Sequence, residues 1–200
     1  MEAIEVLMQE HRTIEQVLDA LEGFAEEVVR ARRTDKEELG RFVTFVREFA
    51  DAFHHGKEED ILFAAMVEAG FPRNGGPIAV MLHEHDQGRG LVQILKARAE
   101  QPGPWTDADR QEIAEVSRGY SQMLHGHIHK EDAVLYPMAE QHLTPEAMAQ
   151  VGEGCERYEA DRLGSHERLH ALAAELVERH APAAHADAQA PHGHRFGCCG

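Results

Sequence analysis

Cysteine and basic residues are both scarce in this chain of 200 residues. Three cysteines occur, and two of them, Cys198 and Cys199, are adjacent near the C-terminus, so the spacing excludes a disulfide framework and favours a reducing compartment. Lys and Arg total 20 against 36 Asp and Glu, which gives a formal charge of −16. Nucleic acids and anionic membranes bind basic surfaces, so we expect neither as a partner.

Long apolar runs and strand patterns are missing as well. No apolar run approaches the roughly 20 residues of a transmembrane helix. The opening residues MEAIEVLMQEH lack the basic-then-apolar pattern of a secretion signal, so we expect a cytoplasmic protein. No segment alternates apolar and polar residues as a half-buried strand does, and the fold class is therefore predicted to be all-α.

Helical periodicity is present over four long segments, in which apolar residues recur every three or four positions. Polar or Gly/Pro-rich stretches separate the segments, and Thr34 and either Thr106 or Asp107 are the expected helix caps. Pro137 is expected to kink or end the fourth helix. The pattern predicts an up-down-up-down four-helix bundle over residues 1–142, a C-terminal helical extension over 143–181 that breaks near Gly164, and a disordered tail over 182–200.

One motif of histidine and carboxylate residues occurs twice. The first copy is FHHGKEEDILF, which contains His54 and Glu58, and the second is HIHKEDAVLYP, which contains His127 and Glu131. Residues four apart lie above one another on a helix, so each His–Glu pair can reach the same space. Imidazole and carboxylate ligands suit first-row metals, and iron above all where carboxylates bridge two ions.

One histidine also lies on the apolar stripe of each predicted helix: His11, His54, His85 and His127. In an antiparallel bundle, His11 and His54 fall at about the same level. A lone histidine on such a stripe is usually a hydrogen-bonded core residue, but four of them with two carboxylates one turn away are not explained in that way. An unpaired buried Glu costs several kcal/mol, so the pattern predicts a metal site.

These motifs resemble the hemerythrin-like, or HHE cation-binding, domain. The resemblance is carried by His11, HHGKEEDILF, EHDQGR and HIHKEDAVLYP, and it covers about residues 1–142. It implies a non-haem di-iron centre inside a four-helix bundle, with two iron ions (Fe2+/Fe3+), bridging carboxylates and an oxo or hydroxo bridge as one option. The metal ligands that it implies are His11, His54, Glu58, His85, His127 and Glu131.

The chain departs from the oxygen-carrying members of that group at one position. Their third helix has two histidines four residues apart, whereas here Met81 stands four residues before His85. Four His and two Glu are closer to the bacterial di-iron proteins that repair iron–sulfur centres, although the cysteine-bearing segment of those proteins is not expected here.

The resemblance implies a protein that binds or redox-processes a small ligand, namely oxygen, nitric oxide or peroxide, in stress response or sensing. Whether it turns a substrate over, as an enzyme does, is left open. The alternatives are an iron or redox sensor that acts through a protein partner, a di-iron repair protein for damaged iron–sulfur centres, and a metal-free structural bundle.

Residues beside the motifs compete for the ligand roles. His55 and Glu59 are also four residues apart. Their stripe continues upstream to Asp51 and Glu48, which is typical of a solvated face, whereas the stripe of His54 continues to apolar residues. His54 is therefore preferred as the ligand.

Further residues are assigned to supporting or alternative roles. Asp132 is the alternative to Glu131, because the oxygen carriers use an Asp five residues after this histidine. His83 falls off the apolar stripe and is expected to be exposed or to support a ligand, while Met81 faces the metal pocket. Tyr120, two turns before the fourth-helix histidine, is a candidate hydrogen-bond donor near the metals.

A different motif, HERLH from His166 to His170, matches the zinc-protease signature HExxH. That signature needs a further metal ligand downstream, and Leu176 occupies the place of a third histidine. We interpret this stretch as a docking helix with surface histidines. The tail HGHRFGCCG contains soft ligands for Zn or Cu(I), but its spacing fits no closed zinc site.

Overall fold

The computed structural model describes residues 3–180, and helices account for most of them. No strand occurs in this range, which confirms the all-α prediction. Three stretches are π-helical, with hydrogen bonds to the fifth residue along the chain: η1 (Val46–His55), η2 (Glu58–Leu62) and η3 (Glu131–Leu135). The α-helices are α1 (Ala3–Arg30), α2 (Lys36–Phe45), α3 (Phe63–Glu68), α4 (Gly76–Glu100), α5 (Asp107–Lys130), α6 (Tyr136–His142), α7 (Pro145–Ala160) and α8 (Leu163–His180).

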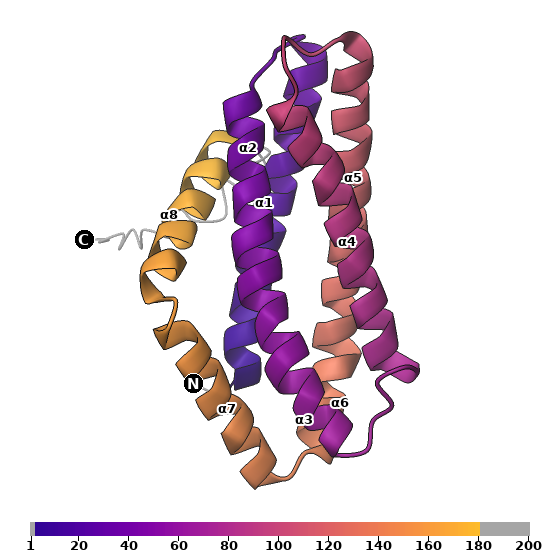
Figure 1. Cartoon of the computed structure of the whole chain (residues 1–200), viewed down its shortest axis with the longest axis vertical. Helices are drawn as coiled ribbons and strands as arrows, with labels where there is room; N and C mark the ends of the chain where they lie inside the picture. The colour runs from indigo at the N-terminus through magenta and orange to yellow at the C-terminus, as the bar shows by residue number, and fades with distance from the viewer. Residues whose placement is uncertain (1–2, 181–200) are drawn as a thin grey trace, which may run out of the picture.

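Four long helical rods lie side by side along the long axis of the molecule (Figure 1). The first rod is α1, the second runs from α2 through η1 and η2 to α3, the third is α4, and the fourth runs from α5 through η3 to α6. Successive rods run in opposite directions (Figure 1). Helix α5 packs against both α1 and α4, and α4 also packs against α2, so the rods enclose a shared interior.

Two apolar clusters fill this interior. One contains the aromatic residues Phe42, Phe45 and Phe49, and the other contains Leu7, Phe63 and Met81 at the opposite end of the rods. Burying one such large side chain contributes about 2 to 3 kcal/mol. The histidine and carboxylate side chains lie between the two clusters, so the clusters shield this polar layer from water along the rods.

Helix starts follow local capping chemistry. The Asp35 side chain caps α2 by accepting a hydrogen bond from the backbone N–H of Glu38 at 3.2 Å, so the expected cap at Thr34 is wrong by one residue. The hydroxyl of Thr34 instead accepts a hydrogen bond from the backbone N–H of Trp105 at 3.1 Å. Thr106 caps α5 in a reciprocal pair with Asp109, one of the two expected alternatives.

The π-helical stretches coincide with the two copies of the His–carboxylate motif. Each extra residue in a turn rotates the following side chains by about 100° around the rod axis, so residues that a regular helix would keep apart can share one face. Pro137 follows η3 as the second residue of α6, and the fourth rod continues to His142, so the proline does not end it.

Helices α7 and α8 return along the outside of the rods, over α1, α2 and η1 (Figure 1). They are separated at Asp161–Arg162, two residues before the expected break at Gly164. The hydroxyl of Tyr158 donates a 2.7 Å hydrogen bond to the backbone carbonyl of Ala52 in η1. At Gly56 the approach is so close that a Cβ atom would lie 2.2 Å from the same hydroxyl.

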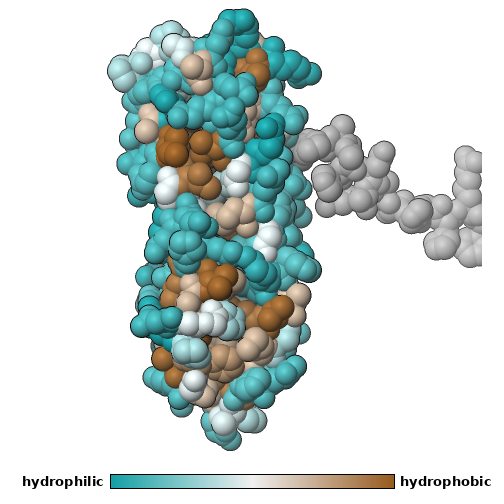
Figure 2. All heavy atoms as spheres, turned by 90° about the vertical axis from the view of Figure 1, so that its right-hand side faces the viewer, coloured by the Kyte–Doolittle hydropathy of each residue, from teal (hydrophilic) through white to brown (hydrophobic). Residues whose placement is uncertain are grey.

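The surface over α4 and α5 is hydrophilic over much of its area, and its apolar side chains gather in an upper group and in a larger area of the lower half (Figure 2). Exposed large apolar residues include Val80 and Ile94 of α4 and Val134 of η3, and such exposure is ordinary for a folded domain. Within residues 3–180, no helix combines the length and the apolar character needed to cross a membrane. The expected disordered tail, residues 182–200 with Cys198 and Cys199, lies outside the described residues.

Candidate metal centre

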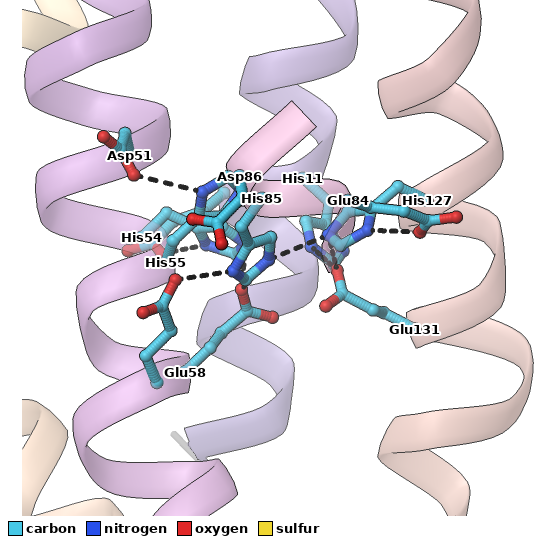
Figure 3. Close-up of polar contacts among 12 residues, drawn as sticks. His11, Asp51, His54, His55, Glu58, Glu84, His85, Asp86, His127 and Glu131 are labelled. Carbon is cyan, nitrogen blue, oxygen red and sulfur yellow. Dashed lines mark hydrogen bonds and ion pairs between the residues drawn. The ribbon is translucent and has the colours of Figure 1, made fainter. Parts of the chain in front are cut away.

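All six residues that the sequence singles out as ligands meet in the polar layer between the apolar clusters (Figure 3). Each is at most 1% exposed. The four rods all contribute, and the two carboxylates come from the π-helical stretches: His11 from α1, His54 from η1, Glu58 from η2, His85 from α4, His127 from α5 and Glu131 from η3.

Each carboxylate lies between two imidazoles from different rods. Oε2 of Glu58 is 3.7 Å from Nε2 of His54 and 3.6 Å from Nε2 of His85. Oε2 of Glu131 is 3.2 Å from Nε2 of both His11 and His127. The ligand atoms of two groups lie within 4.8 Å of one another and are arranged to hold a metal ion: His11, His54, Glu58 and Glu131 in one, and His55, Glu58, His85 and His127 in the other.

The outward nitrogen of each of the four imidazoles faces a carboxylate. Each carboxylate accepts a hydrogen bond from Nδ1–H, so each ring presents Nε2 to the interior, where a metal ion would bind once Nε2 carries no proton. The Nδ1 pairs are His11 with Asp132 at 2.7 Å, His54 with Glu10 at 2.8 Å, His85 with Glu59 at 2.7 Å and His127 with Glu84 at 2.9 Å.

Several inward atoms of this layer lack a hydrogen bond. Among the described residues these include Nε2 of His54, Oε2 of Glu58 and both carboxylate oxygens of Glu131. A buried polar atom without a partner costs about 1 to 3 kcal/mol, and more when it is charged. A bound cation would satisfy all of these atoms at once, so the residues fit a divalent first-row metal.

The two carboxylates have opposite ionisation tendencies. Burial raises the pKa of Glu58 well above its usual value, and the nearby Glu131 adds to the rise. Burial acts on Glu131 in the same direction, but the neighbouring His127 and His11 hold the pKa of Glu131 well below its usual value. A bound cation favours the ionised form of both groups, so metal binding would release a proton from Glu58.

The match with known families agrees with this geometry. The model of the hemerythrin HHE cation binding domain matches residues 2–139. The chain belongs to the hemerythrin HHE family. A domain of that family binds a cation, and the buried His and Glu groups described above are the places where it can do so.

One curated relative also matches this hemerythrin-family chain. It is the iron-sulfur cluster repair protein YtfE of Musicola paradisiaca (strain Ech703), which is 37% identical over 90 residues. The matched region covers 43% of this chain and 40% of the relative, so the chain spans well under half the length of that protein. No solved structure matches the chain significantly.

A tyrosine that the sequence reasoning missed completes the hemerythrin-type layer. The Tyr136 hydroxyl donates a 2.7 Å hydrogen bond to Oε1 of Glu58 and lies 3.3 Å from Nε2 of His11. The side chain is fully buried, and burial raises the pKa of Tyr136 well above its usual value, so it remains a donor. The repeated motif holds a signal for it, because the equivalent place in the first copy is the apolar Phe63.

Lys57 is a second residue that the sequence reasoning missed. Its ammonium group is fully buried and lies 2.5 Å from Oε1 of Glu10 and 2.7 Å from Oε1 of Glu159 in α7. The other oxygen of Glu10 bonds to His54. A chain of contacts therefore links the C-terminal extension to a metal-facing imidazole.

The second copy of the motif has a similar chain of contacts, but its lysine is not buried. Lys130 stands in the place of Lys57 and pairs with Glu84, the carboxylate that holds His127. The Lys130 side chain is 41% exposed, whereas that of Lys57 is 0% exposed. The two halves of the centre thus have the same kinds of ligand, but they differ in how far their lysine is buried.

His55 corrects the sequence interpretation. It was expected on a solvated face with Glu59 and Asp51, but it is only 5% exposed and its ring stacks on His85 with 3.7 Å between centroids. The π-helical stretch η1 buries three successive residues, Phe53, His54 and His55, so both histidines lie toward the interior. Nδ1 of His55 has no hydrogen bond and lies 3.5 Å from Asp51.

The remaining candidates lie outside the two ligand groups. Asp132 points outward to His11, so Glu131 occupies the inward place of the two alternatives. His83 is exposed, and Met81 lies in the apolar cluster with Leu7.

A small cavity borders the centre at His55 and His85. Its volume is about 30 Å³, and its walls include Gly88, Arg89 and the buried ring of Tyr120. By the same measure about 10 to 15 Å³ already holds one water molecule, so the cavity has room for a very small ligand. Tyr120 therefore faces this cavity and not a ligand carboxylate.

The HExxH stretch lacks the surroundings of a zinc-protease site within the described residues. Among the described residues, the groups of three or more clustered metal-ligating side chains do not include His166 or His170. No strand occurs in residues 3–180 that could border a substrate cleft. Both histidines lie in α8, which docks on the rods.

Proposed function

We propose that this chain is a non-haem di-iron protein that binds or redox-processes oxygen, nitric oxide or peroxide. The observation that carries the proposal is the buried layer of four imidazoles and two carboxylates with inward atoms that lack hydrogen bonds. The proposal includes two ions, one for each ligand group, and the up-down-up-down four-helix bundle as the scaffold of the four rods.

The side chains have distinct roles in this proposal. His11 and His54 would hold one ion, His85 and His127 would hold the other, and Glu58 and Glu131 would supply carboxylate ligands. The outer carboxylates fix each ring and increase the basicity of Nε2. Iron, when bound, supplies one-electron redox chemistry and a coordination position that an external ligand can occupy.

The size of the cavity beside the metal centre supports the proposal of a small ligand. The cavity of about 30 Å³ at His55 and His85 accommodates a diatomic molecule or one of similar size. The apolar clusters on both sides keep bulk water from the layer, which strengthens electrostatic interactions within it.

Anaerobic stopped-flow spectroscopy tests the proposal. The reduced, iron-loaded protein should change its optical spectrum when mixed with oxygen and with nitric oxide. Gly88→Ala should slow both reactions without loss of iron, because the added Cβ would contact Met123 at 3.2 Å and narrow the cavity. Gly119→Ala, where a Cβ meets nothing within 4 Å, is the matched control. Iron-loaded protein that responds to neither gas would contradict the proposal.

Repair of iron–sulfur centres is the second candidate, and the similarity to the Musicola repair protein supports it. The test is recovery of activity by an enzyme whose iron–sulfur cluster has been damaged with nitric oxide. Recovery that needs iron-loaded native chain, and that fails with Glu58→Ala, would favour repair. Gas-dependent spectral changes without recovery would favour ligand binding alone.

Location and partners are part of the proposal as well. The small number of cysteines supports a cytoplasmic location. The formal charge of −16 supports a protein that uses neither nucleic acid nor a membrane as its main partner.

A further inference from the structure

The HExxH stretch of α8 brings two imidazole nitrogens together outside the buried centre. Nε2 of His166 lies 3.0 Å from Nε2 of His170, and the ring centroids are 4.4 Å apart. The four-residue spacing places both rings on one face of the helix. Both side chains are partly exposed, so solvent reaches them.

The separation of the two nitrogens matches that of neighbouring ligands on one ion. Imidazole nitrogens bind Zn2+ at about 2.0 to 2.1 Å, so two of them at angles of about 90 to 109° lie roughly 2.9 to 3.4 Å apart. The pair therefore needs no movement of α8 to hold an ion. Without an ion, a single proton between the two nitrogens is all that joins them.

The two rings are also held in place. His170 packs edge-on against Phe49 at 5.0 Å between centroids, and His166 packs against Phe53 at 4.7 Å. Both phenylalanines belong to η1 and are buried, so they form a rigid platform beneath the pair. Rings fixed in this way lose little side-chain entropy when they bind an ion.

We propose that His166 and His170 form a second, peripheral metal site that takes one Zn2+, Ni2+ or Cu2+ ion, with water completing the coordination. Neutral imidazole pairs favour these ions over Mg2+ or Ca2+, and affinity along the first-row series is highest near Cu2+. Glu167 is exposed and points away from the pair as the next residue along the helix, so it is not a ligand. An ion held here would staple one turn of α8, because both ligands belong to that helix.

Zinc binding by the iron-loaded full chain tests the site. Isothermal titration should show a binding event in the native protein that weakens at least about tenfold in His170→Ala, because one of two protein ligands is lost. His142→Ala, which removes an exposed histidine of α6, is the matched control and should leave the event unchanged. Glu167→Gln should also leave it unchanged. Equal affinity in the native protein and His170→Ala would overturn the proposal.

Hydrogen exchange of α8 provides a readout that the histidines of the tail cannot mimic. An ion that binds only the intact helix slows exchange through local opening by a factor of about 1 + [Zn2+]/Kd, which is roughly tenfold at ten times Kd. We expect this protection in the native protein and His142→Ala, and its loss in His170→Ala and in the polar variant His170→Asn. Zinc that binds without slowing α8 exchange, or iron that is lost from His170→Ala, would refute a separate site on this helix.

Discussion

At the scale of single residues, burial and neighbouring charges together determine how the metal-facing imidazoles ionise. Burial alone lowers the pKa of His11, but the hydrogen bond to Asp132 and the nearby Glu131 carboxylate outweigh it and raise that pKa to about 9. For His54, burial and the nearby His11 lower the pKa well below its usual value. The layer thus contains both a charged and a neutral imidazole when no metal is bound.

This contrast predicts how the stability of the metal-free protein depends on pH. Because the folded pKa of His11 is raised, its stabilisation is complete below about pH 6.5 and is lost as the pH rises toward about 9. The free energy of unfolding should fall by up to about 3 kcal/mol over that range. In Asp132→Asn the free energy of unfolding should depend less on pH, since the change removes a main cause of the raised pKa of His11.

Urea denaturation of the metal-free protein at several pH values measures this effect. Asp60→Asn, which removes one negative charge from an exposed position, is the control and should leave the pH profile nearly unchanged. Equal profiles for native protein and Asp132→Asn would show that this contact does not control the ionisation of His11.

Two adjacent histidines of η1 should respond differently to truncation. His54 has both an inward nitrogen facing Glu58 and an outer partner, Glu10, whereas His55 has no hydrogen bond on Nδ1. His54→Ala should therefore lower iron affinity by at least about 10- to 100-fold, and His55→Ala by less. Iron analysis after dialysis against a chelator, with the exposed His129→Ala as control, decides this. Equal losses for His54→Ala and His55→Ala would contradict the ranking.

Some residues of the metal centre could be predicted from the sequence and others could not. His11 and the two His–Glu pairs were found because a polar side chain on an apolar stripe is conspicuous at helical spacing. Tyr136 and Lys57 were missed because a tyrosine and a lysine with a long apolar stem both fit an apolar stripe without any metal. Their importance depends on contacts between rods that are distant in sequence.

At the scale of elements, the helices were predictable and the π-helical stretches were not. Apolar periodicity and capping residues mark where a helix lies to within a few residues. A π-helical turn adds one residue and leaves no mark in a pattern that already alternates between spacings of three and four. This is why His55 was assigned to a solvated face.

The contact between α7 and η1 leads to a prediction about two glycines. Gly56→Ala should lower the free energy of unfolding by about 1 to 3 kcal/mol, because the new Cβ would lie 2.2 Å from the Tyr158 hydroxyl. Gly126→Ala in α5, where nothing lies within 4 Å, should raise it by about 0.5 to 1 kcal/mol through helix propensity.

A double-mutant cycle isolates the cause. Tyr158→Phe removes the hydroxyl, so the cost of Gly56→Ala should be smaller in the Tyr158→Phe background, measured by thermal or urea unfolding. Strict additivity of the two changes would mean that α7 does not press on η1 at this point.

At the scale of the whole molecule, the C-terminal extension makes the two halves of a repeated motif unequal. Lys57 of the first copy is sealed by Glu159 of α7, while Lys130 of the second copy stays at the surface. The cavity lies beside His55 of the first copy and His85 of α4. The sequence indicated an extension, but where it docks depends on contacts such as that of Tyr158 that periodicity does not encode.

The central claim is that one buried layer holds two irons with shared carboxylates. The most direct test is the iron content of anaerobically reconstituted protein after removal of loosely bound metal, combined with Mössbauer spectroscopy of the oxidised form. The account predicts about two irons per chain, magnetically coupled, and at most one in Glu58→Ala, whereas Glu48→Ala, an exposed position on η1, keeps both. A fully folded native chain that retains no iron, or two uncoupled irons unaffected by Glu58→Ala, would contradict it.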